Sequence, residues 1–252
     1  MPDLITIEKY FAVFVIYCVI GWVYECIVES IRQKKVVNRG FLNGPYIPIY
    51  GFGALIDIVC LGWCKNPVIL FVLSAFLCCT LEYITSVVME KLFNARWWDY
   101  YDFKFNLNGR ICLLGAFAFG TLSVMLVKFI HPFFWNLIEN IPGAVFNILC
   151  LTLFLLILTD VIITVAGFSS FDGKLKELSL SINAIKDNLD TKVNSSAAVE
   201  KISSAYTKVI GTLNHQQIRL LRSFPRLKSI KYGNISDELK KFLFKNKDKD
   251  DQ

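Results

Sequence analysis

The chain contains only two histidines. They lie at positions 131 and 215, and neither has a cysteine or a second histidine close in sequence, which argues against a zinc site. No segment matches the phosphate-binding pattern G-x-x-x-x-G-K-[ST]. We therefore expect no metal and no other cofactor. Any ATP-driven activity would require a separate ATPase subunit.

Two further features of secreted proteins are missing. The first residues, MPDLITIEKY, lack the basic start of a signal peptide, and no A-x-A-like site follows the first apolar run, so we read that run as a retained span. All eight cysteines lie in or beside apolar segments. A disulfide framework would place them in extracytoplasmic loops, so we expect them to pack between helices as small apolar side chains.

The chain is unusually rich in hydrophobic residues. Hydrophobic residues make up 54% of it and the mean hydropathy is +0.48, which is more than a soluble domain usually carries. A spanning helix needs about 20 mostly apolar residues. Five stretches qualify: Tyr10–Val28, Ile47–Cys64, Pro67–Val88, Ile111–Ile130 and Gly143–Gly167. The second is interrupted by Pro48, Gly51 and Gly53, so it is either a span or a broken, re-entrant helix. The fold class is an all-α, multi-pass membrane bundle.

The basic residues alternate between the predicted loops. One loop carries Arg32, Lys34, Lys35 and Arg39, and another carries Lys91, Arg96, Lys104 and Arg110. The remaining connections carry only Lys65 and only Lys128. By the positive-inside rule, five spans then place the N-terminus outside and the C-terminus in the cytoplasm, in the plasma membrane. The net charge of +6 suits anionic lipid head groups and predicts no nucleic-acid partner.

The polar part of the chain predicts a cytoplasmic tail. We divide the chain into a transmembrane domain (1–168), a helical hairpin (169–232) and a charged, largely disordered end (233–252). Two heptad stripes indicate the hairpin. They contain Phe171, Leu175, Leu178, Ile182, Ile185 and Leu189, then Val199, Ile202, Tyr206, Val209, Leu213 and Leu220.

The turn of this hairpin falls at Asn194-Ser195-Ser196, and Pro225 ends its second helix. The stripes either fold back on each other or form a homodimeric coiled coil. A folded-back hairpin would bring four cations to the lipid head groups, namely Arg219, Arg222, Arg226 and Lys228; alternatively, these cations only solubilise the tail.

Five acidic residues fall within or at the end of the predicted spans. They are Glu25, Glu29, Asp57, Glu82 and Asp160. Acids at membrane depth are costly, so we expect them to face the bundle interior or a water-filled cavity. One reading is a cytoplasm-facing cavity that binds a cation or a cationic head group. The other is structural, with Arg39 and Arg110 neutralising some of the acids.

Two loops between the spans are rich in glycine, asparagine and aromatic residues. We expect them to form a polar cluster at the cytoplasmic mouth. Its members are Asn38, Arg39, Asp99, Asn106, Asn108 and Arg110.

These loops also carry a family resemblance. NRGFLNGPYIPIYGFG (38–53), WWDY (97–100) and NLNGR (106–110) resemble the signature of the bacterial CmpB family of ABC-transporter type IV proteins. That family is grouped with the animal transmembrane protein 229 proteins. The resemblance implies a permease-like component and carries over no catalytic residues.

The sequence is compatible with three functions. A transport component without its own ATPase accounts for the acids within the spans. A scaffold or sensor would act through the tail, as a monomer or a homo-oligomer. An enzyme acting on inner-leaflet lipids is disfavoured, because no histidine or nucleophile accompanies the acids.

Overall fold

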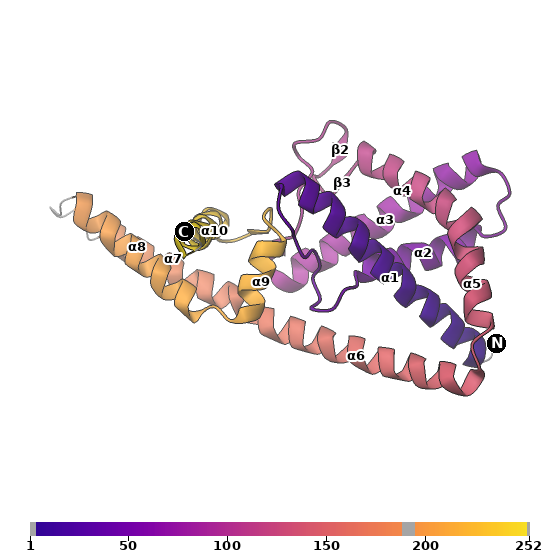
Figure 1. The fold of residues 1–252 in the computed structure, drawn as a ribbon. Helices are drawn as coiled ribbons and strands as arrows, with labels where there is room; N and C mark the ends of the chain where they lie inside the picture. The colour runs from indigo at the N-terminus through magenta and orange to yellow at the C-terminus, as the bar shows by residue number, and fades with distance from the viewer. Residues whose placement is uncertain (1–3, 188–194, 251–252) are drawn as a thin grey trace. The chain divides into compact units, whose positions relative to one another are not determined.

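The computed structural model describes residues 4–187 and 195–250 (Figure 1). Contacts within the chain divide it into two compact units. The first, here called the membrane unit, contains the described residues up to Val88 together with Trp98–Thr164. The second, here called the tail unit, contains Met89–Trp97 and the described residues from Val165 onward.

Helices dominate the membrane unit, which has only two short strands in its described part. In chain order the elements are α1 (Leu4–Gln33), α2 (Pro48–Leu61), α3 (Pro67–Phe93), β2 (Asn106–Leu107), β3 (Ile111–Cys112), α4 (Leu113–Met125), the π-helix η1 (Leu126–Ile130), α5 (His131–Glu139) and α6 (Gly143–Ser169). The last turn of α3 and the end of α6 belong to the tail unit. The predicted all-α membrane class is confirmed.

Four helical segments are long and apolar enough to cross a membrane. They are Ile5–Gln33, Pro67–Phe93, Leu113–Glu139 and Gly143–Ile185. The third is longer than predicted, because η1 and α5 continue the helix beyond Ile130. Lys128 therefore lies in a helix and not in a loop, and its Nζ donates to the carbonyl of Cys64 at 2.6 Å. The five-span, N-out arrangement stays a prediction.

The second predicted span is a short helix. α2 has 14 residues, so it is about 21 Å long, less than the roughly 30 Å hydrocarbon core. It begins beside the middle of α1, where the amide of Ile47 donates to the carbonyl of Cys18 at 2.9 Å. Residues 36–47, here called the entry segment, form no helix and lead to this point. The irregular backbone thus precedes Pro48, and α2 runs through Gly51 and Gly53 without a break.

The backbone of the entry segment is hydrogen-bonded to side chains of the flanking helices. The amide of Val37 donates to Ser30 Oγ at 3.0 Å, and the amide of Arg39 donates to Cys26 Sγ at 3.2 Å. Further along, the amides of residues 43 and 44 donate to the carboxylate of Asp160 on α6. Non-helical backbone is tolerated at membrane depth only where protein satisfies it, and here α1 and α6 do so.

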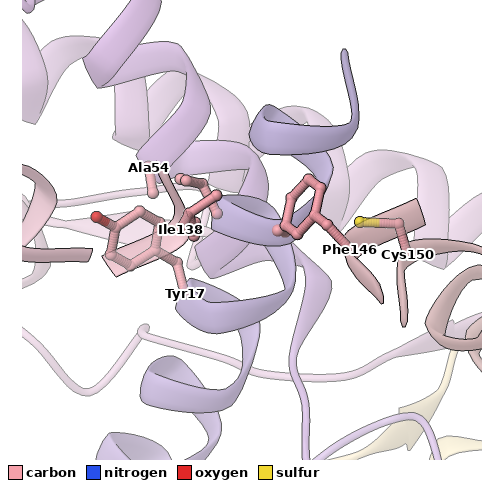
Figure 2. Packing of buried hydrophobic residues seen from close by; sticks show 7 residues of the cluster. Tyr17, Ala54, Ile138, Phe146 and Cys150 are labelled. Atoms are coloured by element: carbon pink, nitrogen blue, oxygen red, sulfur yellow. The ribbon is translucent and has the colours of Figure 1, made fainter. Parts of the chain in front are cut away.

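Helices α1 and α2 pack closely and antiparallel. A Cβ on Gly51 would overlap Cys18 Sγ and the ring of Phe14, and a Cβ on Gly21 would overlap the ring of Tyr50. Figure 2 shows the neighbouring apolar core, in which residues of α1, α2, α5 and α6 meet. Its buried members are Ala12, Val13, Tyr17, Ala54, Ile138, Phe146 and Cys150. All eight cysteines are free thiols, and four of them are buried.

The tail unit combines the C-terminal helices with the segment that follows the α3 span. Its elements are β1 (Ala95–Arg96), α7 (Phe171–Asp187), α8 (Ser195–Thr212), α9 (His215–Ser223), β4 (Lys228–Ser229) and α10 (Gly233–Asp250). β1 pairs antiparallel with β4, Ala95 opposite Ser229. Trp97 is buried, and its ring contacts the rings of Phe168 and Phe224. This tryptophan is therefore a core residue of the tail unit.

The predicted hairpin is present but its second helix is broken. The stripes from Phe171 to Ile182 and at Tyr206 and Val209 are buried. Leu189 and Asn194 lie outside the described residues. Instead of continuing from Leu213 to Leu220, the helix stops, and Asn214 begins α9 with a capping box that it forms with Gln217. The side-chain amides of Asn214 and Gln217 both donate to the carbonyl of Gly167. These two bonds hold the chain at the break between α8 and α9.

The end of the chain differs from the prediction. We expected residues 233–252 to be largely disordered, yet Gly233–Asp250 form α10. The ring of Phe242 stacks on Tyr206 at 4.7 Å, and Leu239 is fully buried. Tyr206 also donates to Glu238 at 2.6 Å. The charged composition concealed a short apolar stripe that packs on α8.

The close approach of α1 and α2 yields a first prediction. Gly51→Ala should destabilise the protein by about 1–3 kcal/mol, because the added methyl group overpacks against Cys18 and Phe14. Thermal unfolding in detergent measures the effect. Gly143→Ala is the matched control, since nothing lies within 4 Å of its added Cβ. An unchanged midpoint for Gly51→Ala would contradict this packing.

Candidate functional site

Glu25 and Tyr50 form the first half of a polar cluster near the C-terminal ends of α1 and α3. The hydroxyl of Tyr50 donates to Glu25 Oε1 at 2.7 Å. Arg39 Nε of the entry segment lies 3.6 Å from Glu25 Oε2. The structural reading of the sequence, in which Arg39 neutralises an acid, is thus compatible with this geometry.

Glu82 on α3 forms the second half of the cluster. Its side chain is buried, with 7% exposed, and it accepts a 3.1 Å hydrogen bond from the hydroxyl of Tyr100. No ion pair joins Glu82 to any Lys or Arg of the described chain. The charge of Glu25 acts on both Glu82 and Tyr100. Two acids from two helices therefore share one region, and each is held by a tyrosine.

Tyr100 lies in a loop outside the helices. Burial, followed by the nearby charges of Glu82 and Glu25, raises the pKa of the Tyr100 phenol well above its ordinary value. The phenol therefore keeps its proton and acts as a hydrogen-bond donor to Glu82.

The loop that supplies Tyr100 is fastened by Arg110 and Asn108. Arg110 Nη1 donates to Ser86 Oγ at 2.9 Å, and its guanidinium lies over the ring of Tyr83. Asn108 Nδ2 donates to the Tyr83 hydroxyl at 3.1 Å. The two bonds attach the β2–β3 hairpin to α3 at Tyr83, directly after Glu82, and at Ser86, one turn beyond it.

The other predicted loop residues hold the loops in shape. Asn38 accepts a bond from Trp22 Nε1 at 3.0 Å. Asp99 accepts the amide of Tyr101, and Asn106 accepts the amide of Gly109, each at 3.0 Å. The bonds of Asp99 and Asn106 lie within their own loop, whereas the bond of Asn38 joins the entry segment to α1.

Asp160 is a clamp on the entry segment. Its carboxylate accepts the amide of Asn43 at 3.1 Å, the amide of Gly44 at 2.8 Å and the Asn43 side-chain amide at 2.7 Å. The hydroxyls of Tyr46 and Thr164 add two further bonds, at 2.6 and 3.1 Å. Such a set of donors satisfies the carboxylate, so the contacts of Asp160 are those of an anchor.

The remaining two acids differ from each other. Glu29 is buried and bonded within its own helix, to Arg32 at 2.6 Å and to Gln33 at 2.5 Å. Asp57 on α2 is 1% exposed and lies beside Cys78 of α3, one turn before Glu82; Cys78 Sγ donates to Asp57 Oδ2 at 3.7 Å. In residues 4–187 and 195–250, no three His, Cys, Asp or Glu side chains are grouped to hold a metal ion.

The predicted head-group cations all belong to the tail unit. Arg219 Nε donates to Gln216 at 3.4 Å, and Lys228 Nζ lies 3.7 Å from Asp237. Arg222 is exposed and Arg226 is half-buried. Their contact with lipid stays a prediction.

Sequence reasoning missed the partners of the acids. Tyr50, Tyr100, Asn43 and Tyr46 all lie inside the motifs singled out above, but nothing in their spacing paired them with residues far away in the chain. The density of tyrosine and asparagine in otherwise apolar surroundings was the available signal.

An apolar hollow lies next to the cluster. It has a volume of about 380 Å³ and opens between α3, the β2–β3 hairpin and α4. Its lining residues are Cys79, Phe105, Asn106, Leu107, Ile111, Cys112, Leu113 and Ala116.

The fold and this site define an α-helical membrane protein with buried acids held by its loops. The family model described as Putative ABC-transporter type IV matches residues 12–165, which is more than half of the chain. The chain belongs to this family, which also confirms the resemblance seen in the sequence. No curated protein and no solved structure matches the chain significantly.

The Asp160 clamp yields a second prediction. Asp160→Asn should destabilise the protein by about 1.5–3 kcal/mol, since bonds to a charged acceptor are lost. Hydrogen exchange at the amides of Asn43 and Gly44 should accelerate. Thr159→Val is the control, because the Thr159 hydroxyl bonds only to its own helix at Leu155. Unchanged exchange at residues 43 and 44 would rule the clamp out.

Proposed function

We propose that this protein is the permease-like membrane component of a transporter, with a cytoplasm-facing acidic cavity at Glu25 and Glu82 and with a separate ATPase subunit. The family and the apolar helices fit a membrane transport component. We place it in the plasma membrane as a multi-pass protein. The sequence contains no phosphate-binding loop, so ATP hydrolysis would have to come from a second subunit.

The observation that carries the proposal is the environment of Glu82. A carboxylate at membrane depth is costly without a cation, and Glu82 forms no ion pair with a described residue. Its bond to Tyr100 comes from a loop, so movement of that loop would open the acid to the cytoplasm. A cation or a cationic head group would then complete the pair of acids. In the resting structure, Arg39 occupies the Glu25 side.

Identification of copurifying small molecules tests whether Glu25 and Glu82 bind a cation. The tagged protein is purified in mild detergent from its own host, and bound small molecules are identified by mass spectrometry. We expect a cationic ligand that is retained by the wild type and lost from Glu25→Gln/Glu82→Gln. Glu139→Gln is the control, since Glu139 pairs with Lys9 elsewhere in the membrane unit. Equal retention in the double variant would refute the cavity.

The ATPase subunit is tested in the same preparation by lysine cross-linking. We expect cross-links from a stoichiometric ATPase to exposed lysines of the tail unit, such as Lys176 and Lys241, and none to Lys9. Truncation after Phe168 would be a poor substitute, because it would uncover Trp97, which packs on Phe224. A pure preparation without any ATPase would favour the scaffold or the lipid-acting enzyme instead.

A further inference from the structure

Asp57 occupies a polar pocket among three helices. Besides Cys78, the hydroxyl side chains of Ser74 on α3 and Ser123 on α4 adjoin its carboxyl group. Cys78 Sγ lies 4.0 Å from Ser123 Oγ, which links the three helices around the acid. Asp57, Ser74 and Ser123 are all buried, with 1%, 0% and 5% exposed.

Two oxygen atoms of this group lack a hydrogen-bond partner. They are Asp57 Oδ1 and Ser74 Oγ, both among the buried atoms of the described chain. Buried polar atoms are nearly always paired, because an unpaired one costs about 1–3 kcal/mol. Two unpaired oxygens in adjoining side chains therefore point to a missing partner that both can contact.

A positively charged partner would satisfy both the two oxygens and the buried charge. Among the described residues, Asp57 forms no ion pair with Lys, Arg or His, and a lone carboxylate is costly at membrane depth. A proton on Asp57 would also neutralise the charge, but it would leave Ser74 Oγ without a partner. A cation between them would contact Asp57 Oδ1 and Ser74 Oγ at once.

The ligands indicate which cation. Carboxylate and hydroxyl oxygens are hard ligands, which suit alkali and alkaline-earth ions. Calcium takes six to eight oxygens, often several of them from carboxylates, and magnesium keeps several waters. One carboxylate with two hydroxyls balances a single positive charge.

We propose that Asp57, Ser74 and Ser123 bind one monovalent cation of the size of Na⁺. The inference rests on the proposed transport function and deepens it, because an ion bound at Asp57, and not at Glu25 or Glu82, would serve as a coupling ion. Binding of the ion is a property of the resting protein, so it is measured without transport.

The test uses the full-length protein in detergent, with radioactive ²²Na⁺ as the probe and choline chloride keeping the ionic strength constant. We expect one Na⁺ per chain and a thermal midpoint that rises with NaCl until the site is filled. Asp57→Asn should abolish binding. Ser74→Ala and Ser123→Ala should each weaken it about ten-fold or more.

Each serine variant has a control on the same helix. Thr80→Val on α3 and Thr121→Val on α4 remove exposed hydroxyls that bond only to their own helices, at Phe76 and Phe117. These variants should bind Na⁺ as the wild type does. If Asp57→Asn does not fold, the two serine variants and their controls decide the question.

Two results would overturn the inference. One is the absence of Na⁺ binding, or binding that Ser74→Ala and Ser123→Ala leave unchanged. The other is a thermal midpoint that responds to pH through Asp57 but not to Na⁺, which would show a neutral carboxyl group. A wild-type preparation that contains neither a copurifying cationic ligand nor an ATPase would refute the proposed function while Na⁺ binding stands, so the two failures are distinguishable.

Discussion

The entry segment depends on protein for its backbone hydrogen bonds, as non-helical backbone between membrane helices does wherever lipid offers it no water. Five of its amides meet this demand through α1 and α6: those of residues 37, 39 and 47 bond to Ser30, Cys26 and Cys18, and those of 43 and 44 bond to Asp160. These bonds bring the chain back beside the middle of α1. They allow α2 to begin there and still be short.

The polar cluster follows from this arrangement. Because α2 starts beside Cys18, its first turn carries Tyr50 to Glu25, and the entry segment carries Arg39 to the same acid. Glycine at positions 21 and 51 permits the close contact of the two helices. A more regular second span of 20 residues would place neither group there. The irregular backbone is thus the feature that builds one half of the site.

Local signals predicted much of the fold. Hydropathy located the long helices, and Pro48 marks the first residue of α2, although Gly51 and Gly53 do not interrupt that helix as expected. The contacts that pair distant segments were not predictable in this way. Asp160 and Asn43 are 117 residues apart, and β1 pairs with β4 across more than 130 residues, with no periodicity to relate them. Likewise, the break at Asn214 depends on the carbonyl of Gly167, which a heptad stripe does not report.

The five acids were indistinguishable in the sequence, and their surroundings separate them. Asp160 is satisfied by the entry segment, Glu29 by its own helix and Glu25 by Arg39 and Tyr50. Glu82 and Asp57 are both buried, and no ion pair with a described residue compensates either charge. An uncompensated acid at membrane depth costs several kcal/mol of stability, so a contribution to stability does not explain its presence. The physical argument for ligand binding is therefore strongest at these two residues, one bonded to a loop through Tyr100 and the other enclosed by three helices.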